Sequence, residues 1–396
     1  MNGNIGWKYY KDYYHGFDFK RAGKGNDTYQ EDHFKPKNEA IRQLLLQDQP
    51  AGLLGLGFQG LSTLELETTY PGLMSGTGLS HETKSMGESK LGFAFDHTSG
   101  LPYLPASSVK GVLRSMFPQR VNRQKAPKLK EGREQRYKLM YYLLQQATQW
   151  DEQGLKQRLT SWLETRGIEA GYAFQLKGEA LGFIDLLELE MFEGIQPDLV
   201  EKKEELLPEL LPQSVYARDI FFDAYPAESR KHGGRFVDFD FITPHKHEDD
   251  ENLDPFANPT PIKFLKVLPA VVFRFQFRLK DGLLSAHQKL GLIRQMLLFH
   301  GVGAKTNVGY GQLQQPVEIR RFEVGELVEA TITKTLNEDR YMEETEVEVQ
   351  VHETETTIMV NVGKKKAKRL QKDEVKQFEI KEIDKDGNII RLVIKS

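Results

Sequence analysis

The most informative stretch of this sequence is rich in glycine and runs from residue 301 to residue 311. It reads Gly301, Val302, Gly303, Ala304, Lys305, Thr306, Asn307, Val308, Gly309, Tyr310, Gly311. Glycines let backbone amides come close to a phosphate group, and a lysine and a hydroxyl can bind the same anion. Because these residue types occur together, the stretch predicts a phosphate-binding loop.

The stretch differs from a nucleotide-binding P-loop. That motif needs a glycine directly before the lysine, and a strand that leads through the loop into a helix. Here Ala304 precedes Lys305, and the periodicity predicts the order helix, loop, strand. Nucleotide hydrolysis by this loop is therefore not expected. The preceding helix is expected to be capped near Ser285 and to bury Leu290, Ile293, Leu297 and Leu298.

Two strands are predicted on the N-terminal side of this helix. In residues 273–279 the phenylalanines alternate with Arg274, Gln276 and Arg278, so one face is apolar and the other polar. The polar face can serve as a platform for RNA or simply face solvent. Residues 62–70 show the same period of two, with Leu64, Leu66, Thr68 and Tyr70 on one side.

A second motif lies between these strands, at residues 100–114. Pro105 disfavours helix before it, and either Ser107 or Ser108 can cap a helix that begins there. Lys110 and Arg114 then share one face of that helix, one turn apart. The motif predicts a helix whose first turns are polar and basic.

The regions around this core differ from it in apolar spacing and in charge. Residues 119–212 show apolar residues at spacings of three and four, and they predict a helical insertion with a basic leading edge and an acidic far end. That basic edge can contact RNA or be a solvated helix face. Residues 1–50 form an aromatic and basic arm, able to stack bases or to dock on a partner or on the body.

Residues 322–396 contain several short alternating strands without a long helix, which predicts a small β-barrel of the oligonucleotide-binding (OB) kind. A basic run follows the third predicted strand. It can bind RNA or be a solvated loop, and it contains Lys364, Lys365, Lys366, Lys368, Arg369 and Lys372.

Composition limits the function classes. The chain has 396 residues, a net charge of −3 and no cysteine, so RNA can be bound only through a local basic surface, and disulfides and cysteine-ligated zinc are excluded. The sequence contains no apolar run of about 20 residues and no signal-like start, so a membrane partner is not expected and the cytoplasm is the expected location.

The two motifs together resemble the RAMP family. Residues 301–311 resemble its C-terminal glycine-rich loop, and residues 100–114 resemble its signature with Ala106 where glycine is usual. The resemblance implies an α+β fold, with a ferredoxin-like (RRM-like) RAMP domain over residues 51–321. The implied RNA-binding residues are Ser107, Ser108, Lys110, Arg114, Gly301, Gly303, Lys305, Thr306, Asn307, Gly309, Tyr310 and Gly311.

Three further segments are similar to the sixth RAMP subunit of the type III-B CRISPR (Cmr) complex. They are Ile-Phe-Phe-Asp-Ala-Tyr-Pro at 220–226, Asp-Phe-Ile-Thr-Pro-His at 240–245 and Pro-Ile-Lys-Phe-Leu at 261–265. The resemblance implies a cytoplasmic antiviral-defence subunit near the 3′ end of the guide RNA (crRNA). The implied partners are guide and target RNA, backbone RAMP subunits, small helical subunits and a neighbouring 3′-end RAMP subunit.

Catalysis is not expected, because the resemblance assigns target cleavage to the backbone subunits. His245 and His247 share a face if they lie on a strand, but Pro244 and the acidic run after them indicate a loop, so neither a functional metal nor a cofactor is expected. The alternative is a RAMP endoribonuclease that processes CRISPR precursor RNA, for which His81, Glu82 and Asp96 are the acid–base candidates.

Overall fold

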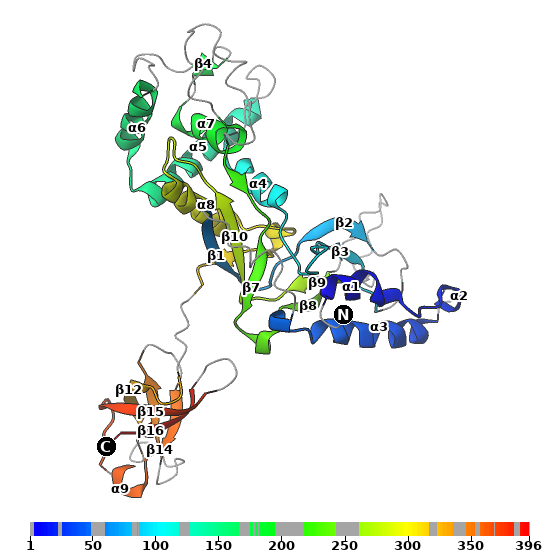
Figure 1. Ribbon diagram of the computed structural model, residues 1–396, viewed down its shortest axis with the longest axis vertical. Coiled ribbons are helices and arrows are strands. Elements are labelled where there is room, and N and C mark those ends of the chain that lie inside the picture. The colour runs from blue at the N-terminus through cyan, green and yellow to red at the C-terminus, as the bar shows by residue number, and fades with distance from the viewer. Residues whose placement is uncertain are drawn as a thin grey trace. The chain divides into compact units, whose positions relative to one another are not determined.

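The computed structural model divides the chain into two compact units, Met1–Pro316 and Val317–Ser396 (Figure 1). The division falls close to residue 322, where the barrel was expected to start. The structure describes residues 4–22, 26–48, 60–80, 85, 87–118, 127–165, 175–176, 179–180, 182–194, 218–242, 261–316, 323–335, 346–352, 357–367, 369–383 and 389–395. Within these ranges no helix is long and apolar enough to cross a membrane.

A five-stranded sheet forms the centre of the larger unit. Its order is β11-β1-β10-β6, with β7 also paired to β10, and every pairing is antiparallel. The strands are β1 (Ser62–Thr68), β6 (Ile220–Phe221), β7 (Tyr225–Ser229), β10 (Val271–Arg278) and β11 (Leu313–Gln314). Phe273, Phe275 and Phe277 are buried, which confirms the alternation predicted for β10.

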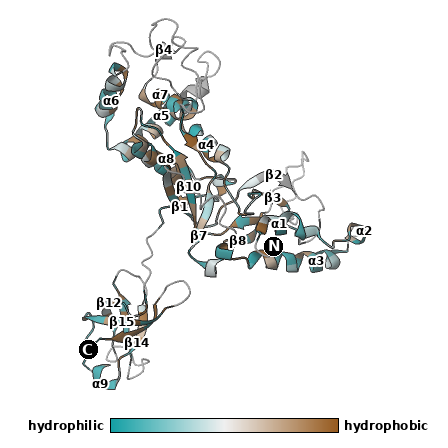
Figure 2. Cartoon of the chain, in the orientation of Figure 1, coloured by the Kyte–Doolittle hydropathy of each residue, from teal (hydrophilic) through white to brown (hydrophobic). Residues whose placement is uncertain are grey.

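Two helices pack against the apolar face of this sheet, α4 (Ala106–Ser115) and α8 (Ala286–His300). Helix α8 contacts β1 and β11, and Figure 2 shows apolar residues along α8 and β10. The predicted cap of α8 is confirmed, because Ser285 and Gln288 form a reciprocal capping box at its first turn.

The cap predicted for α4 is wrong. Neither Ser107 nor Ser108 caps the helix, whose N-cap residue is Pro105. Instead the carboxylate of Asp223 accepts a hydrogen bond from the Ala106 amide at 2.6 Å. A carboxylate from a segment more than a hundred residues away therefore satisfies a helix donor that the local sequence assigned to serine.

The described part of residues 119–212 is mostly helical and also contains a short hairpin. It contains α5 (Pro127–Thr148), α6 (Glu152–Glu164), a small hairpin of β4 (Gln175–Leu176) and β5 (Glu179–Ala180), and α7 (Phe183–Glu188), which continues into a π-helical turn, η4 (Leu189–Glu193). Helix α5 packs on α8, so the insertion extends the helical layer.

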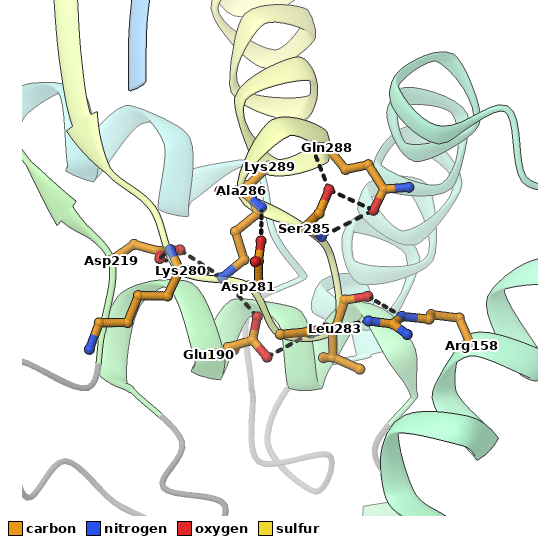
Figure 3. Close-up of polar contacts among 11 residues, drawn as sticks. Arg158, Glu190, Asp219, Lys280, Asp281, Leu283, Ser285, Ala286, Gln288 and Lys289 are labelled. Carbon is orange, nitrogen blue, oxygen red and sulfur yellow. Dashed lines mark hydrogen bonds and ion pairs between the residues drawn. The ribbon is translucent and has the colours of Figure 1, made fainter. Parts of the chain in front are cut away.

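A buried ionic cluster ties the insertion to the core (Figure 3). The Lys289 ammonium of α8 lies 2.8 Å from Glu190 in η4 and 3.1 Å from Asp219, and its side chain is only 1% exposed. Beside it, Arg158 of α6 donates to the carbonyls of Gly282 and Leu283 at 2.6 and 2.8 Å. The Lys289–Glu190 pair holds α8 against the insertion, and the hydrogen bonds of Arg158 hold the β10–α8 connection against it.

The N-terminal segment packs on two β-hairpins. It forms α1 (Ile5–Tyr10), η1 (Asp12–Tyr14), α2 (Phe19–Ala22), α3 (Asp27–Arg42) and η2 (Leu46–Asp48), and the hairpins are β2 (Gly76–Ser80) with β3 (Leu91–Phe93) and β8 (Val237–Ile242) with β9 (Ile262–Val267). A short turn, η6 (His232–Gly234), precedes β8. Tyr9 and Tyr13 are fully buried, and the Tyr9 hydroxyl donates to the Leu91 carbonyl at 2.6 Å. The sequence left open whether the arm stacks bases or docks on a protein surface. The rings of Tyr9 and Tyr13 dock on the body of the protein.

The C-terminal unit is a nearly closed, barrel-like sheet. Its strands are β12 (Leu327–Lys334), β13 (Glu346–Val351), β14 (Thr357–Asn361), β15 (Val375–Ile383) and β16 (Ile389–Ile394), in the order β14-β13-β12-β15-β16. The end strands β14 and β16 lie side by side, and a short helix, α9 (Lys364–Ala367), joins β14 to β15. Strand β15 was not predicted, because its apolar alternation is interrupted by exposed Val375 and by bulges opposite β16.

Candidate nucleic-acid interface

The glycine-rich loop connects α8 to β11 and is fastened to the chain that leaves β1. The Ala304 amide donates to the Met74 carbonyl at 2.7 Å, and the Gly311 amide donates to the Gly72 carbonyl at 2.8 Å. The Thr69 amide donates to the Gln312 carbonyl at 3.1 Å. These backbone hydrogen bonds fix the loop to residues 69–74, a segment far from it in sequence.

The backbone conformation of the loop and its packing against the rest of the chain require glycine at these positions. Gly301, Gly303, Gly309 and Gly311 all have positive φ, which side-chain-bearing residues rarely adopt. A Cβ atom on Gly303 would lie 2.5 Å from the Met74 carbonyl oxygen, and one on Gly311 would collide with the Val302 carbonyl. The close backbone approach predicted for these two glycines is therefore an approach to the protein's own chain. Contact with RNA stays a prediction for them.

The tip of the loop has the geometry of an anion-binding nest. Lys305 is left-handed, with φ 61° and ψ 34°, and a right-handed turn, η7 (Thr306–Val308), follows it directly. Successive residues of opposite hand point their amides into one concavity. The amides of Lys305, Thr306 and Asn307 make no hydrogen bond to any part of the chain that the structure describes. The tip thus presents successive backbone donors and one ammonium.

An exposed tyrosine stands beside this nest, and sequence reasoning placed it wrongly. Tyr70 was grouped with the inward side of β1, but the strand ends at Thr68 and the Tyr70 side chain is 85% exposed. Its neighbour Pro71 lies next to Gly309, where a Cβ atom would be 3.5 Å from the proline Cδ. Val308 is also 61% exposed. The signal available in the sequence was the Pro-Gly pair after Tyr70, which ends a strand.

The start of α4 reaches the same edge of the sheet. The segment bonded to the loop continues to Ser75, whose hydroxyl donates to the Tyr103 carbonyl at 2.7 Å, directly before Pro105 and α4. Ser107 and Ser108 are exposed in the first turn. We use the term loop surface for the side chains of Tyr70, Ser107, Ser108, Lys305, Thr306, Asn307 and Val308.

Tyr310 belongs to the support of the loop surface. Its side chain is 7% exposed, its ring packs edge-on against Phe264, and its hydroxyl donates to Asp240 at 2.8 Å. Burial and this hydrogen bond raise the pKa of Tyr310, so the hydroxyl stays protonated. Burial alone would raise the pKa of Asp240, but hydrogen bonds from Lys266, the Phe241 amide and Tyr310 outweigh it and hold the pKa below its ordinary value.

Lys110 and Arg114 are not part of the loop surface. They share one face of α4 as predicted, but that face meets the end of the insertion. Lys110 donates to the Phe192 carbonyl at 3.1 Å, and Arg114 lies 3.1 Å from Glu188 and 2.5 Å from Glu193. The cations that resemble the family signature therefore have protein partners already.

The polar face of the central sheet is electrically balanced. Arg274 lies 2.8 Å from Glu65 on the neighbouring strand, and Arg230 lies 3.8 Å from Glu67. Carboxylates at these positions oppose phosphate, so this face is a poorer phosphate-binding surface than the nest. Of the acid–base candidates, Asp96 accepts hydrogen bonds from Thr98 and Ser99 in a local turn.

His81, Glu82, His245 and His247 lie outside the described residues. Within the described part of the chain, no group of histidine and acidic side chains is placed to hold a metal ion.

Comparison with known proteins identifies the family. The chain is similar over part of its length to a subunit in the cryo-EM structure of the type III-B Cmr-beta complex bound to cognate target RNA, with 18% identity, 75% of this chain and 74% of that chain covered, and a TM-score of 0.37. It is also similar to Cmr6 from Pyrococcus furiosus, with 20% identity, 66% and 100% covered, and a TM-score of 0.28. No curated protein gives a match. The RAMP superfamily model matches residues 65–314, which span the central sheet, both core helices and the glycine-rich loop, so this chain belongs to the RAMP superfamily.

Proposed function

We propose that this protein holds guide RNA through its loop surface and does not cut RNA itself. The observation that carries the proposal is the nest at Lys305, where successive amides without a hydrogen-bond partner in the described chain occur together with a lysine at the tip of the loop. Phosphate oxygens of an RNA backbone are the anions that such a site fits best in a member of an RNA-binding family.

The proposed fold of the core is ferredoxin-like. Helix α4 lies in the chain between β1 and the strands β6 and β7, which both pair with β10. Helix α8 lies between β10 and β11, and these two strands pair with β1 on its two sides. Two interleaved βαβ units of this kind are the arrangement of that fold. The loop surface then lies at the end of the sheet where α8 finishes, α4 begins and β1 leaves.

The proposed setting is a type III-B CRISPR (Cmr) effector complex. The segments at 220–226, 240–245 and 261–265 support a place as its sixth RAMP subunit, toward the 3′ end of the guide. Its partners there would be guide and target RNA, backbone RAMP subunits, small helical subunits and the neighbouring 3′-end RAMP subunit. Cryo-electron microscopy of the co-expressed complex would test this placement, and a guide 3′ end held by another subunit would contradict it.

The non-catalytic role is supported by the chemistry of the loop surface. Its polar side chains are hydroxyl, amide and ammonium groups, which bind phosphate, and the adjacent carboxylate of Asp240 is engaged by Lys266 at 2.6 Å and by Tyr310. Incubation of the purified protein with precursor guide RNA should give no cleavage. Cleavage that is abolished by His81→Ala would establish the endoribonuclease instead.

RNA titration of matched lysine variants tests the binding site. Lys305→Ala should weaken guide-RNA binding by about 1.5–3 kcal/mol, because one charge-assisted hydrogen bond is lost. Lys280→Ala is the control, since this exposed lysine lies before α8 and the loop follows that helix. Equal affinity of both variants and the wild type would argue against the loop surface as the RNA site.

A further inference from the structure

The C-terminal barrel is outside the region that matches the RAMP superfamily, which ends at residue 314. It has its own core, in which Ile332, Val349 and Phe378 are fully buried. The function proposed for the loop surface of the larger unit therefore does not explain what this barrel does.

Charge is unevenly distributed over the barrel. Its strands carry carboxylates on the outward side, with Glu329 on β12 and Glu346 and Glu348 on β13 alternating with buried valine and alanine. These acids oppose the binding of a polyanion on the β12–β13 face. The connection from β14 to β15 has the opposite charge, because every charged side chain in residues 363–372 is basic.

Helix α9 presents this basic charge outward. Ala367 is 3% exposed and packs on the barrel core, which fixes the orientation of the short helix. The side chains of Lys364, Lys365 and Lys366 are exposed, as is Arg369 in the following turn. Figure 2 shows α9 as a hydrophilic projection of the barrel.

Three cations of this connection differ from other lysines of the barrel in their partners. Lys334, Lys376 and Lys381 each form an ion pair with a nearby glutamate. Among the residues that the structure describes, Lys365, Lys366 and Arg369 form no ion pair. Unpaired, exposed cations close together are the groups that counterions surround and that a polyanion displaces.

We propose that the α9 segment, Lys364–Ala367 with Arg369, is a second RNA-binding site that contacts the phosphodiester backbone without selecting bases. The pairing of the strands supports an oligonucleotide-binding barrel, since the first strand pairs with the second and fourth and a helix lies between the third and fourth. Phe378 is the only phenylalanine, tyrosine or tryptophan in the described part of the barrel, and it is buried, so none of these rings is exposed there for a base to stack on.

The test compares two full-length variants with the same charge change in the same unit. K365Q/K366Q/R369Q neutralises the α9 segment, and K381Q/R391Q/K395Q neutralises exposed cations on β15, on β16 and just after β16. Binding of a fluorescent 20-nucleotide polyuridine RNA is titrated at several salt concentrations. The α9 variant should reduce the slope of log affinity against log salt by about 2, because each single-strand phosphate contact contributes about 0.7. The control variant should keep the wild-type slope.

Repeating both titrations in a Lys305→Ala background separates this site from the loop surface. An α9-dependent slope that persists there supports a second site, whether or not Lys305 itself binds RNA. The same slope for wild type and the α9 variant, or an equal reduction in both triple variants, would overturn the proposal. Thermal unfolding and circular dichroism of each variant confirm that the barrel is folded.

Discussion

Lys305 combines a strained backbone with a half-buried position at the tip of the glycine-rich loop. A left-handed conformation costs a non-glycine residue about 1–2 kcal/mol, and such strain is retained where surrounding contacts impose it, often at binding sites. Here the neighbouring residue Ala304 is bonded to Met74, and the loop closes on Gly311. The strain is consistent with a lysine kept for its ammonium group.

The expected outcome of Lys305→Gly follows from this strain. Glycine relieves the left-handed conformation and keeps the amides of the nest, so the free energy of unfolding should rise by up to about 1 kcal/mol while guide-RNA affinity falls. Chemical denaturation and RNA titration measure the two effects. Lys305→Ala is the matched comparison, because it removes the ammonium and keeps the strain. A glycine variant with unchanged RNA affinity would show that the charge is not used.

Asp240 should make the loop support sensitive to acid. Its pKa is below the ordinary value, so its carboxylate stabilises the folded state above the unfolded pKa of about 4, and this stability is lost as the pH falls through the folded value. The free energies of unfolding of wild type and Asp240→Asn, measured by urea denaturation, should therefore differ most near neutral pH and converge as the pH falls from about 4 through the folded pKa. A difference that is constant with pH would assign the effect to packing.

At the residue scale, the sequence predicts some contacts and misses others for a physical reason. The capping box of Ser285 and Gln288 is local, because the partners are three residues apart. The cap of α4 comes from Asp223, and the exposure of Tyr70 depends on a turn held by Gln312. Contacts between distant segments leave no periodic signal, so the sequence could name the loop surface only in part.

At the scale of elements, the buried cluster around Lys289 decides how the insertion is held. Lys289 forms ion pairs with both Glu190 and Asp219 in a buried site. Burial raises the pKa of Asp219, against the lowering effects of Lys289 and the Lys280 amide. The lysine therefore offsets part of the cost of burying these two carboxylates.

Lys289→Met should destabilise the larger unit by about 3–5 kcal/mol, because it leaves two buried carboxylates without a cation. The loss should be smaller at acid pH, since protonation removes the uncompensated charge. Chemical denaturation at two pH values measures both effects. Lys280→Met is the control for the change of side chain, since that lysine is exposed. A similarly small effect of both substitutions would mean that the cluster does not anchor the insertion.

Elements with a regular apolar period could be predicted from the sequence, and irregular ones could not. Strand β10 and helix α8 bury one continuous face, and both were predicted within a few residues of their observed bounds. Strand β15 lacks this signal, since Val375 is exposed and the pairing with β16 is bulged. A bulge shifts the register of a strand, so its pairing cannot be predicted from a regular alternation of apolar and polar residues.

At the scale of the whole molecule, each unit has a separate core. The core of the larger unit and the core of the barrel have no residue in common, and the contacts divide the chain between Pro316 and Val317. Units with separate cores can unfold as separate transitions. The glycine-rich loop and the α9 segment then depend on different folding equilibria.

Val349→Asp tests this independence. Val349 is fully buried in the barrel, and an unpaired carboxylate there should abolish the barrel's unfolding transition while leaving that of the larger unit unchanged. Differential scanning calorimetry of the full chain measures the transitions. In the Val349→Asp variant, the contribution of the α9 segment to the salt dependence of RNA affinity should change. The effect of Lys305→Ala on guide-RNA affinity should persist. If the Lys305 effect were lost together with the barrel, the two RNA-binding surfaces would have to act as one, because separate cores cannot transmit that loss by themselves.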